Sequence, residues 1–329
     1  MKETFSLFES YPYYSHHFMD KEFWEPYVRE VYNRHSATPA NTVRAGLAGT
    51  CPTFIVDDRW VIKFFGRLFE GEKSFLAEWE ANQLLLRDPA VRAASLVASG
   101  RLFEQSEEWP WPYLIFEYLP GVSIGEVYDQ VSHEDKLRIA IWMGEFTRRL
   151  HSLALGGSLF FQPDWKAFLT LLEQQRASCQ ANHHEWASLP GPLIAQIEDY
   201  LLPLDQLVDL TALPYLIHAD LTQDHLLGRL VDGGWETLGI IDFGDAMVAD
   251  LAYELVALHF DLFHCDKRLL EIFLDTYGMK KGDRKTLLRR AMNMALLHRF
   301  DVFVCVSKYL PQAHQASTLE ELAEWVWGI

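Results

Sequence analysis

Apolar residues recur at helical spacing near the start of the chain. In the stretch KEFWEPYVREVYNRHS, Phe23, Val28 and Val31 would lie on one face of a helix. The surrounding residues mix aromatic and charged side chains. The pattern predicts one or two helices, which form an N-terminal helical extension over residues 1–40 ahead of the main fold.

The pattern changes after this extension. In NTVRAGLAGTCPTFIVDDRWVIKFF, short apolar runs are separated by two turns, the first with two glycines and the second with two aspartates. We expect three antiparallel strands here. The next stretch, GEKSFLAEWEANQLLLRD, returns to the helical period, and PYLIFEYL predicts one more strand, which Pro120 and Gly121 end.

Beyond this strand the pattern is helical, with one interruption that reads as strands at residues 215–243. The predicted helical segments are 133–153, 164–182, 191–207, 248–277 and, in pieces, 283–327. The chain therefore predicts an α+β protein of two lobes. An antiparallel-sheet N-lobe would cover residues 41–118, and a larger, mostly helical C-lobe would cover residues 119–329.

Composition narrows the class of partner. The 329 residues include 29 Lys plus Arg against 46 Asp plus Glu, which gives a formal charge of −17. Such a surface repels phosphate backbones and anionic lipids, so we expect no nucleic acid or membrane partner, and a cationic ligand is favoured. The four cysteines form no CxxC pair, and no run of eighteen apolar residues occurs. We expect a cytoplasmic protein, and nothing in the sequence indicates its oligomeric state.

The densest group of chemically active residues lies in HADLTQDHLLGRLVDGGWETLGIIDFGDA. LLGRLV and WETLGII predict a hairpin around DGG. With the turn centred between Gly233 and Gly234, His225 and Asp242 lie opposite each other at the open end, and Asp220 lies in the loop outside it. Two carboxylates and an imidazole can hold a divalent ion beside a phosphate, or take a proton from a substrate hydroxyl. Taken singly, each residue is more simply a polar residue at a strand end, so the interpretation rests on their combination with the hairpin and IIDFGD.

HADLTQDH and IIDFGDA resemble the catalytic loop and the metal-binding Asp-Phe-Gly of kinase-like enzymes, in the aminoglycoside phosphotransferase and choline kinase family. The resemblance implies a bilobal protein-kinase-like fold in which Asp220 is the catalytic base, Asp242 and His225 bind Mg²⁺, and His218 braces the loop. The family usually has Asn at the place of His225. Macrolide-phosphorylating members are similar to this chain in having His there, and an imidazole ligand would also suit Mn²⁺.

Further motifs of the family occur upstream, in the expected order. RAGLAG resembles the loop over the phosphates, and WVIKFF places Lys63 on a strand, like the lysine that contacts the α- and β-phosphates. In FLAEWEANQLL, Glu78 and Glu80 point about 200° apart on a helix, so only one can pair with Lys63, and the family pattern favours Glu78. PYLIFEYLPG resembles the hinge, where the Glu117 carbonyl and the Leu119 amide would contact the base.

The resemblance implies a phosphotransferase that moves the γ-phosphoryl group of ATP or GTP to a hydroxyl of a small molecule. No long activation segment follows Asp242, which argues against a protein acceptor. An aminoglycoside, a macrolide, an amino sugar and a choline-like alcohol all remain open. The acceptor is expected between helices at about 160–205 and 255–329. His225 leaves one alternative, a non-catalytic kinase-like module that binds a nucleotide or another ligand.

Overall fold

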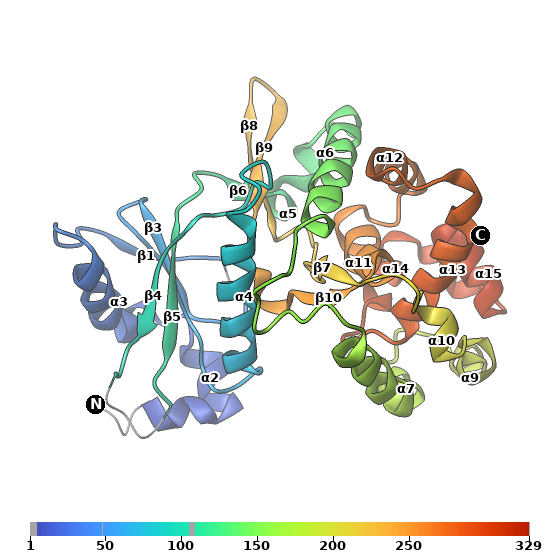
Figure 1. Ribbon diagram of the computed structural model, residues 1–329, viewed down its shortest axis with the longest axis horizontal. Helices are drawn as coiled ribbons and strands as arrows, with labels where there is room; N and C mark the ends of the chain where they lie inside the picture. The colour runs from blue at the N-terminus through green and yellow to red at the C-terminus, as the bar shows by residue number, and fades with distance from the viewer. Residues whose placement is uncertain (1–4, 48, 105–108, 329) are drawn as a thin grey trace.

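The computed structural model describes residues 5–47, 49–104 and 109–328 of the chain. A smaller part built on one antiparallel sheet lies beside a larger part that is mostly helical (Figure 1). This arrangement confirms the predicted α+β class with a small N-lobe and a larger C-lobe. None of the described helices combines the length and the apolar character needed to cross a membrane.

Helices precede the sheet, as the apolar spacing predicts. They are η1 (Leu7–Glu9), α2 (Tyr11–His17) and α3 (Lys21–His35). The side chain of Asp20 accepts hydrogen bonds from two backbone amides in the first turn of α3, which fixes where that helix begins. We call residues 5–40 of the structure the extension.

The sheet of the N-lobe has five antiparallel strands in the order β1-β2-β3-β5-β4. They are β1 (Val43–Ala45), β2 (Thr53–Val56), β3 (Trp60–Phe64), β4 (Leu96–Arg101) and β5 (Pro112–Glu117). Our pattern reasoning missed β4. Its sequence, LVASGR, holds few large apolar residues because β4 is an edge strand whose side chains are half-buried or exposed.

Side chains along the central strands alternate between the two faces of the sheet. Phe54, Ile62 and Ile115 are buried against the extension on the outer face. Ile55 and Lys63 point to the inner face, where α4 lies between the sheet and the C-lobe (Figure 1). The alternation therefore explains why a lysine can stand in an apolar strand without entering the apolar core of the outer face.

The inner helix, α4 (Gly71–Leu85), is attached to the C-lobe as well as to the sheet. Glu80 accepts hydrogen bonds from the Ser158 hydroxyl at 2.7 Å and from three backbone amides of the residues that follow Ser158. Just beyond the helix, Arg87 donates to two backbone carbonyls of the neighbouring segment. The hydrogen bonds of Glu80 and Arg87 therefore hold α4 against the larger lobe.

The C-lobe is a helical assembly around one large apolar cluster. Its helices are α5 (Ile124–Val127), η2 (Tyr128–Gln130), α6 (His133–His151), α7 (Lys166–Trp186), α8 (Gly191–Ile194), α9 (Ile197–Tyr200), α10 (Leu204–Leu207), α11 (Leu251–Ala257), the π-helix η4 (Leu258–Leu262), α12 (Lys267–Tyr277), α13 (Lys281–Leu296), α14 (Phe303–Tyr309), η5 (Pro311–Gln315) and α15 (Leu319–Trp327). The range 191–207, which we predicted as helical, is three single turns. Pro203 contributes to this, because a residue before proline disfavours the helical conformation.

Two small sheets complete the C-lobe at the boundary with the N-lobe. One has the order β6-β8-β9 and is formed by β6 (Val122–Ser123), β8 (Leu226–Val231) and β9 (Gly234–Ile240). In the other, β7 (Tyr215–Ile217) pairs with β10 (Met247–Ala249), and the turn η3 (Phe243–Asp245) lies between β9 and β10.

The predicted hairpin is present as β8 and β9, but our register was wrong. The turn is centred between Asp232 and Gly233, whose φ angles of 51° and 80° fit the turn type that needs two left-handed residues. A bulge then shifts the pairing by one residue. As a result the backbone of His225 pairs with Ile241, through a 3.0 Å hydrogen bond, and not with Asp242.

Candidate active site

The loop between β7 and β8 carries Asp220 and is held by a buried carboxylate. Glu254 on α11 is fully buried and accepts hydrogen bonds from the backbone amides of His218 and Ala219, at 2.9 and 2.7 Å. Ala219 has a φ of 68°, in the left-handed region, which costs a residue with a β-carbon roughly 1–2 kcal/mol. The two charge-assisted hydrogen bonds offset that cost, so α11 fixes the conformation of the loop.

His218 braces this loop, as predicted. Its Nδ1 accepts a hydrogen bond from the Asp220 backbone amide at 3.3 Å, so the ring proton is on Nε2, which donates to the Ile241 carbonyl at 3.0 Å. The ring is completely buried, and burial lowers the pKa of His218 to about 4. The imidazole therefore stays neutral and ties the loop to the end of the β9 segment.

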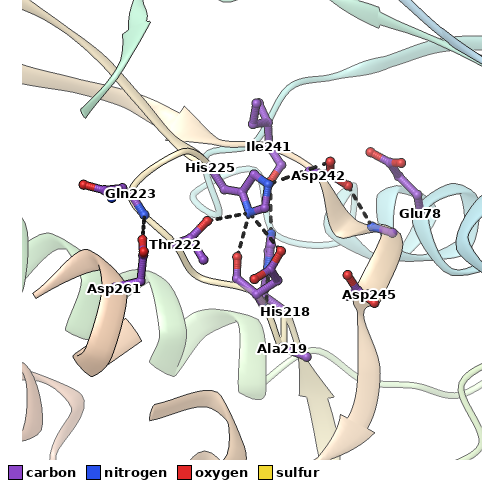
Figure 2. Close-up of polar contacts among 12 residues, drawn as sticks. Glu78, His218, Ala219, Thr222, Gln223, His225, Ile241, Asp242, Asp245 and Asp261 are labelled. Carbon is purple, nitrogen blue, oxygen red and sulfur yellow. Dashed lines mark hydrogen bonds and ion pairs between the residues drawn. The ribbon is translucent and has the colours of Figure 1, made fainter. Parts of the chain in front are cut away.

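His225 lies between the two aspartates and has a defined tautomer. Its Nδ1 is 2.7 Å from the backbone carbonyl of Asp220, which can only accept, so Nδ1 carries the proton. Burial opposes a charge on the ring, but Asp220 and Asp242 raise the pKa of His225 above its usual value. When the ring is neutral its lone pair is on Nε2, the atom that lies 3.8 Å from Oδ2 of Asp242 (Figure 2). The structure thus brings His225 and Asp242 together even though the two residues are not paired in the hairpin.

Lys63 connects the N-lobe to the Asp-Phe-Gly turn. Its Nζ lies 2.7 Å from Oε2 of Glu78 on α4, as predicted, and 2.7 Å from Oδ1 of Asp242. Burial opposes the charge on Asp242, but Lys63 and His225 hold the pKa of this carboxyl well below its usual value. Burial raises the pKa of Glu78 to about 7, with Lys63 opposing the shift. The result is a network of one cation and two carboxylates beside an imidazole.

Asp220 lies next to the network of Lys63, Glu78, Asp242 and His225. Its Oδ2 is 3.4 Å from Nδ1 of His225, and about a third of its side chain remains exposed to solvent. Burial raises the pKa of Asp220 to about 6, His225 opposes the shift, and the negative charges of Asp245 and Asp242 add to it. A carboxylate of this kind can accept a proton near neutral pH and is still reachable by a substrate.

A cavity of about 430 Å³ lies between the lobes, with the Lys63 network on its wall. The described part of the loop 46–51, together with Ile55 and Val61, covers one side of the cavity. Leu227 and Ile240 from the hairpin form the opposite side. Two apolar layers thus face each other across a slot whose far end is strongly charged. We call it the interlobe cavity.

The predicted hinge residues form one edge of this cavity. Glu117 donates its backbone amide to the Ser95 carbonyl, on the side away from β3. Because the amide and carbonyl of a strand residue point the same way, the Glu117 carbonyl also points away from β3. The carbonyl of Leu119 accepts from Gly121 at 2.9 Å, whereas the amide of Leu119 has no hydrogen-bond partner among the described residues.

A second cavity, of about 650 Å³, lies on the other side of the Asp-Phe-Gly turn. It is bounded by the N-terminal halves of α4 and α7, the segment around Phe160 and Phe161, and residues 244–248. Arg299 also lines this cavity, and its guanidinium pairs with Asp245 at 2.5 Å. We call it the acceptor-side cavity, because it adjoins the region in which the sequence places the acceptor.

The roles of four charged residues of the site escaped the sequence reasoning. Glu254 stands in the apolar stretch LAYELVAL, and an acid among buried apolar residues needs a partner, so a signal for it was present. Glu80, which we did not choose as the partner of Lys63, is buried and anchors α4. The pair of Asp245 and Arg299 joins residues 54 positions apart, and no local pattern indicates it.

Residues 50–290 match the model of the phosphotransferase enzyme family, APH. Among curated proteins, the lysine-specific demethylase JMJ21 of Arabidopsis thaliana is 25% identical over 272 residues. That alignment covers 67% of this chain but 29% of the demethylase, so this chain spans less than a third of that relative's length.

Solved structures show the fold. The GDP and kanamycin complex of APH(2'')-IIIa superposes with a TM-score of 0.64 at 22% identity, over 92% of this chain and 96% of that one. The macrolide 2'-phosphotransferase MphH from Brachybacterium faecium gives a TM-score of 0.54 at 17% identity, over 91% and 97% of the two chains. The predicted kinase-like fold is therefore confirmed. Because the family match covers more than half of its residues, this chain belongs to the phosphotransferase enzyme family.

Proposed function

We propose that this protein transfers the γ-phosphoryl group of ATP or GTP to a hydroxyl of a small molecule. The observation that carries the proposal is the continuous network from Glu78 through Lys63, Asp242 and His225 to Asp220. The first four of these residues line the interlobe cavity, and Asp220 lies next to them. Phosphoryl transfer needs mainly positioning and charge neutralisation, and this network offers both. Membership of the phosphotransferase family supports the same reaction class.

The purine base would lie in the slot of the interlobe cavity. Ile55 and Val61 on one side and Leu227 on the other offer the flat apolar contacts that an aromatic ring needs. At the edge, the unpaired Leu119 amide is a donor and the outward Glu117 carbonyl is an acceptor. A donor beside an acceptor fits the edge of adenine or guanine, so both ATP and GTP are candidates.

The triphosphate would be held by Lys63 and by a divalent ion. Among the described residues, no group of three or more His, Cys, Asp and Glu side chains could hold a metal ion. Mg²⁺ is commonly bound by one or two protein ligands together with substrate phosphates, so two ligands suffice. Nε2 of His225 has its lone pair exposed toward Oδ2 of Asp242, the oxygen that Lys63 does not contact. These two atoms fit Mg²⁺ or Mn²⁺, which would neutralise the phosphate charge.

Asp220 would act as the catalytic base. It would orient the acceptor hydroxyl and take its proton as the new oxygen–phosphorus bond forms and the bond from the γ-phosphorus to the nucleoside diphosphate breaks. The raised pKa of Asp220 supports this role, because a base near neutrality accepts the proton readily. His225 would hold the loop that carries Asp220 in a fixed position relative to the phosphates, through its hydrogen bond to the Asp220 carbonyl.

The acceptor would bind in the acceptor-side cavity. Asp245 lies at its edge, close enough to Asp220 for its charge to raise the pKa of that residue. The lining holds three carboxylates and three cationic side chains, and Asp245 and Glu70 are already paired with Arg299 and Lys73. A polycation would need unpaired carboxylates. The cavity therefore favours an alcohol of low net charge with an apolar surface, although the chain as a whole carries −17.

An exchange of one carboxylate for an amide tests the proposal. Asp220→Asn should lower kcat by about a hundred- to ten-thousandfold and leave the nucleotide Kd within about threefold of wild type. The matched control is Asp232→Asn, the same change at an exposed residue in the turn between β8 and β9 that lines neither cavity, which should keep most of the activity. ADP and GDP release would be followed with Mg²⁺ and with Mn²⁺ on kanamycin, a macrolide, glucosamine and choline. Nucleotide binding without turnover on any acceptor would favour the non-catalytic module.

A further inference from the structure

The extension lies outside the part of the chain that the family model explains. The match begins at residue 50, whereas the extension ends ten residues earlier. Nevertheless its helices are packed into the N-lobe: Trp24 and Val28 are completely buried and share a cluster with Phe54 and Phe64 of the sheet. The extension is therefore part of the folded N-lobe, and its contacts with the nucleotide side of the sheet can be followed residue by residue.

One side chain of the extension reaches the loop over the interlobe cavity. Tyr14, on α2, is 2% exposed, and its hydroxyl donates a hydrogen bond to the backbone carbonyl of Thr50. Burial raises the pKa of Tyr14 far above its usual value, so the hydroxyl remains a donor at every physiological pH. Thr50 itself lines the interlobe cavity.

The Tyr14 ring has little freedom to move. It stacks on Phe18 at a centroid distance of 5.4 Å and meets Phe69 edge-on at 5.6 Å. A β-carbon at Gly66 would lie 3.1 Å from the ring, so the ring fits closely against the chain just after β3. Phe69 in turn lies two residues before α4, the helix that carries Glu78. The ring thus holds its hydroxyl at a fixed point relative to β3 and α4.

The loop that receives this hydrogen bond is otherwise fixed near its base. The amide of Gly46 donates to the Thr53 carbonyl at 2.8 Å, and the Thr53 hydroxyl donates to the Cys51 carbonyl at 3.0 Å. The bond from Tyr14 draws the Thr50 carbonyl toward the extension. A carbonyl oxygen turned into the cavity would repel a phosphate, whereas backbone amides attract one. The direction of this one carbonyl therefore affects how well the loop accepts an anion.

We propose that Tyr14 positions residues 49–51 of this loop for the nucleotide phosphates, so that the extension is part of the nucleotide site. This inference rests on the proposed function. Tyr14 is a positioning residue: it contacts neither nucleotide nor acceptor and acts through the Thr50 carbonyl. Removal of the Tyr14 hydroxyl should weaken nucleotide binding. It should not change the rate of the phosphoryl transfer, in which Asp220 is the base.

Tyr14→Phe removes the hydroxyl and keeps the ring. The matched control is Tyr11→Phe, the same change on the same helix at a side chain that is 63% exposed. One neutral hydrogen bond corresponds to about a three- to tenfold change in an equilibrium constant, so Tyr14→Phe should raise the Kd and KM for Mg-ATP and Mg-GTP by about that factor. The kcat at saturating nucleotide should stay within about twofold of wild type. Hydrogen exchange of the backbone amides in residues 46–53 should become faster in this variant alone.

The outcomes separate this inference from the proposed function. Equal nucleotide Kd values for wild type, Tyr14→Phe and Tyr11→Phe would overturn the inference and leave the function standing. The same holds if Tyr14→Phe weakens binding but loop exchange is unchanged, since the hydroxyl would then not act through the loop. A wild-type protein that binds neither nucleotide would overturn both.

Discussion

Replacing Lys63 by methionine tests the ion network at the site. Methionine is close to lysine in length and removes only the charge and its hydrogen bonds. Lys63 is 8% and Glu78 2% exposed, and removing one partner of a buried ion pair costs about 3–5 kcal/mol. The side chain of Asp242 is 37% exposed, so water screens its ion pair with Lys63 and the loss of that pair costs less. We expect the free energy of unfolding to fall by about 3 kcal/mol at about pH 8, the lower end of this range.

The destabilisation caused by Lys63→Met should become smaller as the pH is lowered. Burial raises the pKa of Glu78 to about 7, above the unfolded value of about 4.5, so the folded protein binds this proton more tightly than the unfolded chain. Stability therefore falls as the pH rises from the unfolded to the folded pKa. Without Lys63 the pKa of Glu78 rises further, so the fall in stability continues to higher pH and is larger in total. At about pH 5 Glu78 is protonated in both proteins, and the cost should be near 1 kcal/mol.

Urea unfolding followed by tryptophan fluorescence, in the presence of a chelator, would measure both values, because urea does not screen charges. The control is Lys73→Met, which removes an exposed lysine that pairs with Glu70 at 3.2 Å on the surface. Its effect should be within about 0.5 kcal/mol. The reasoning is refuted if Lys63→Met costs no more than the control at about pH 8, or if it costs more at about pH 5 than at about pH 8.

Two further predictions concern the reaction. Asp220 acts as a base only when ionised, so kcat/KM should be level above about pH 7 and fall about tenfold per pH unit below about pH 6; rates that stay level down to about pH 5 would exclude this base. His225→Asn replaces an imidazole nitrogen by a harder amide oxygen, so the ratio of kcat/KM with Mg²⁺ to that with Mn²⁺ should rise. An unchanged ratio in steady-state assays would show that His225 is not a metal ligand.

Much of the small lobe could be predicted because its signals are local. The alternation in WVIKFF places Lys63 on the inner face, and the helical period of α4 leaves Glu78 as its partner. The meeting of His225 and Asp242 was predicted from a register that proved wrong. The bulge in the hairpin and the left-handed φ of Asp242, 65°, bring the two side chains together in the structure, and neither is visible in the sequence pattern.

The rest could not be predicted because it depends on segments far apart in the sequence. Glu254 binds the amides of His218 and Ala219, 36 and 35 residues away, and Glu80 binds a segment 78 or more residues away. Tyr14 reaches Thr50 across 36 residues. In each case a polar group of one element meets a backbone group of another, and periodicity within one element carries no information about such a meeting.

The attachment of α4 to the larger lobe bears on how the activity could be controlled. Protein kinases regulate themselves by moving the helix that carries the glutamate partner of the strand lysine. Here Glu80, two residues after Glu78, is bonded to the segment that begins at Ser158, and Arg87 is bonded to the same region. A swing of α4 would break all of these bonds at once. We therefore expect the pair of Lys63 and Glu78 to stay assembled without an activating signal that moves α4.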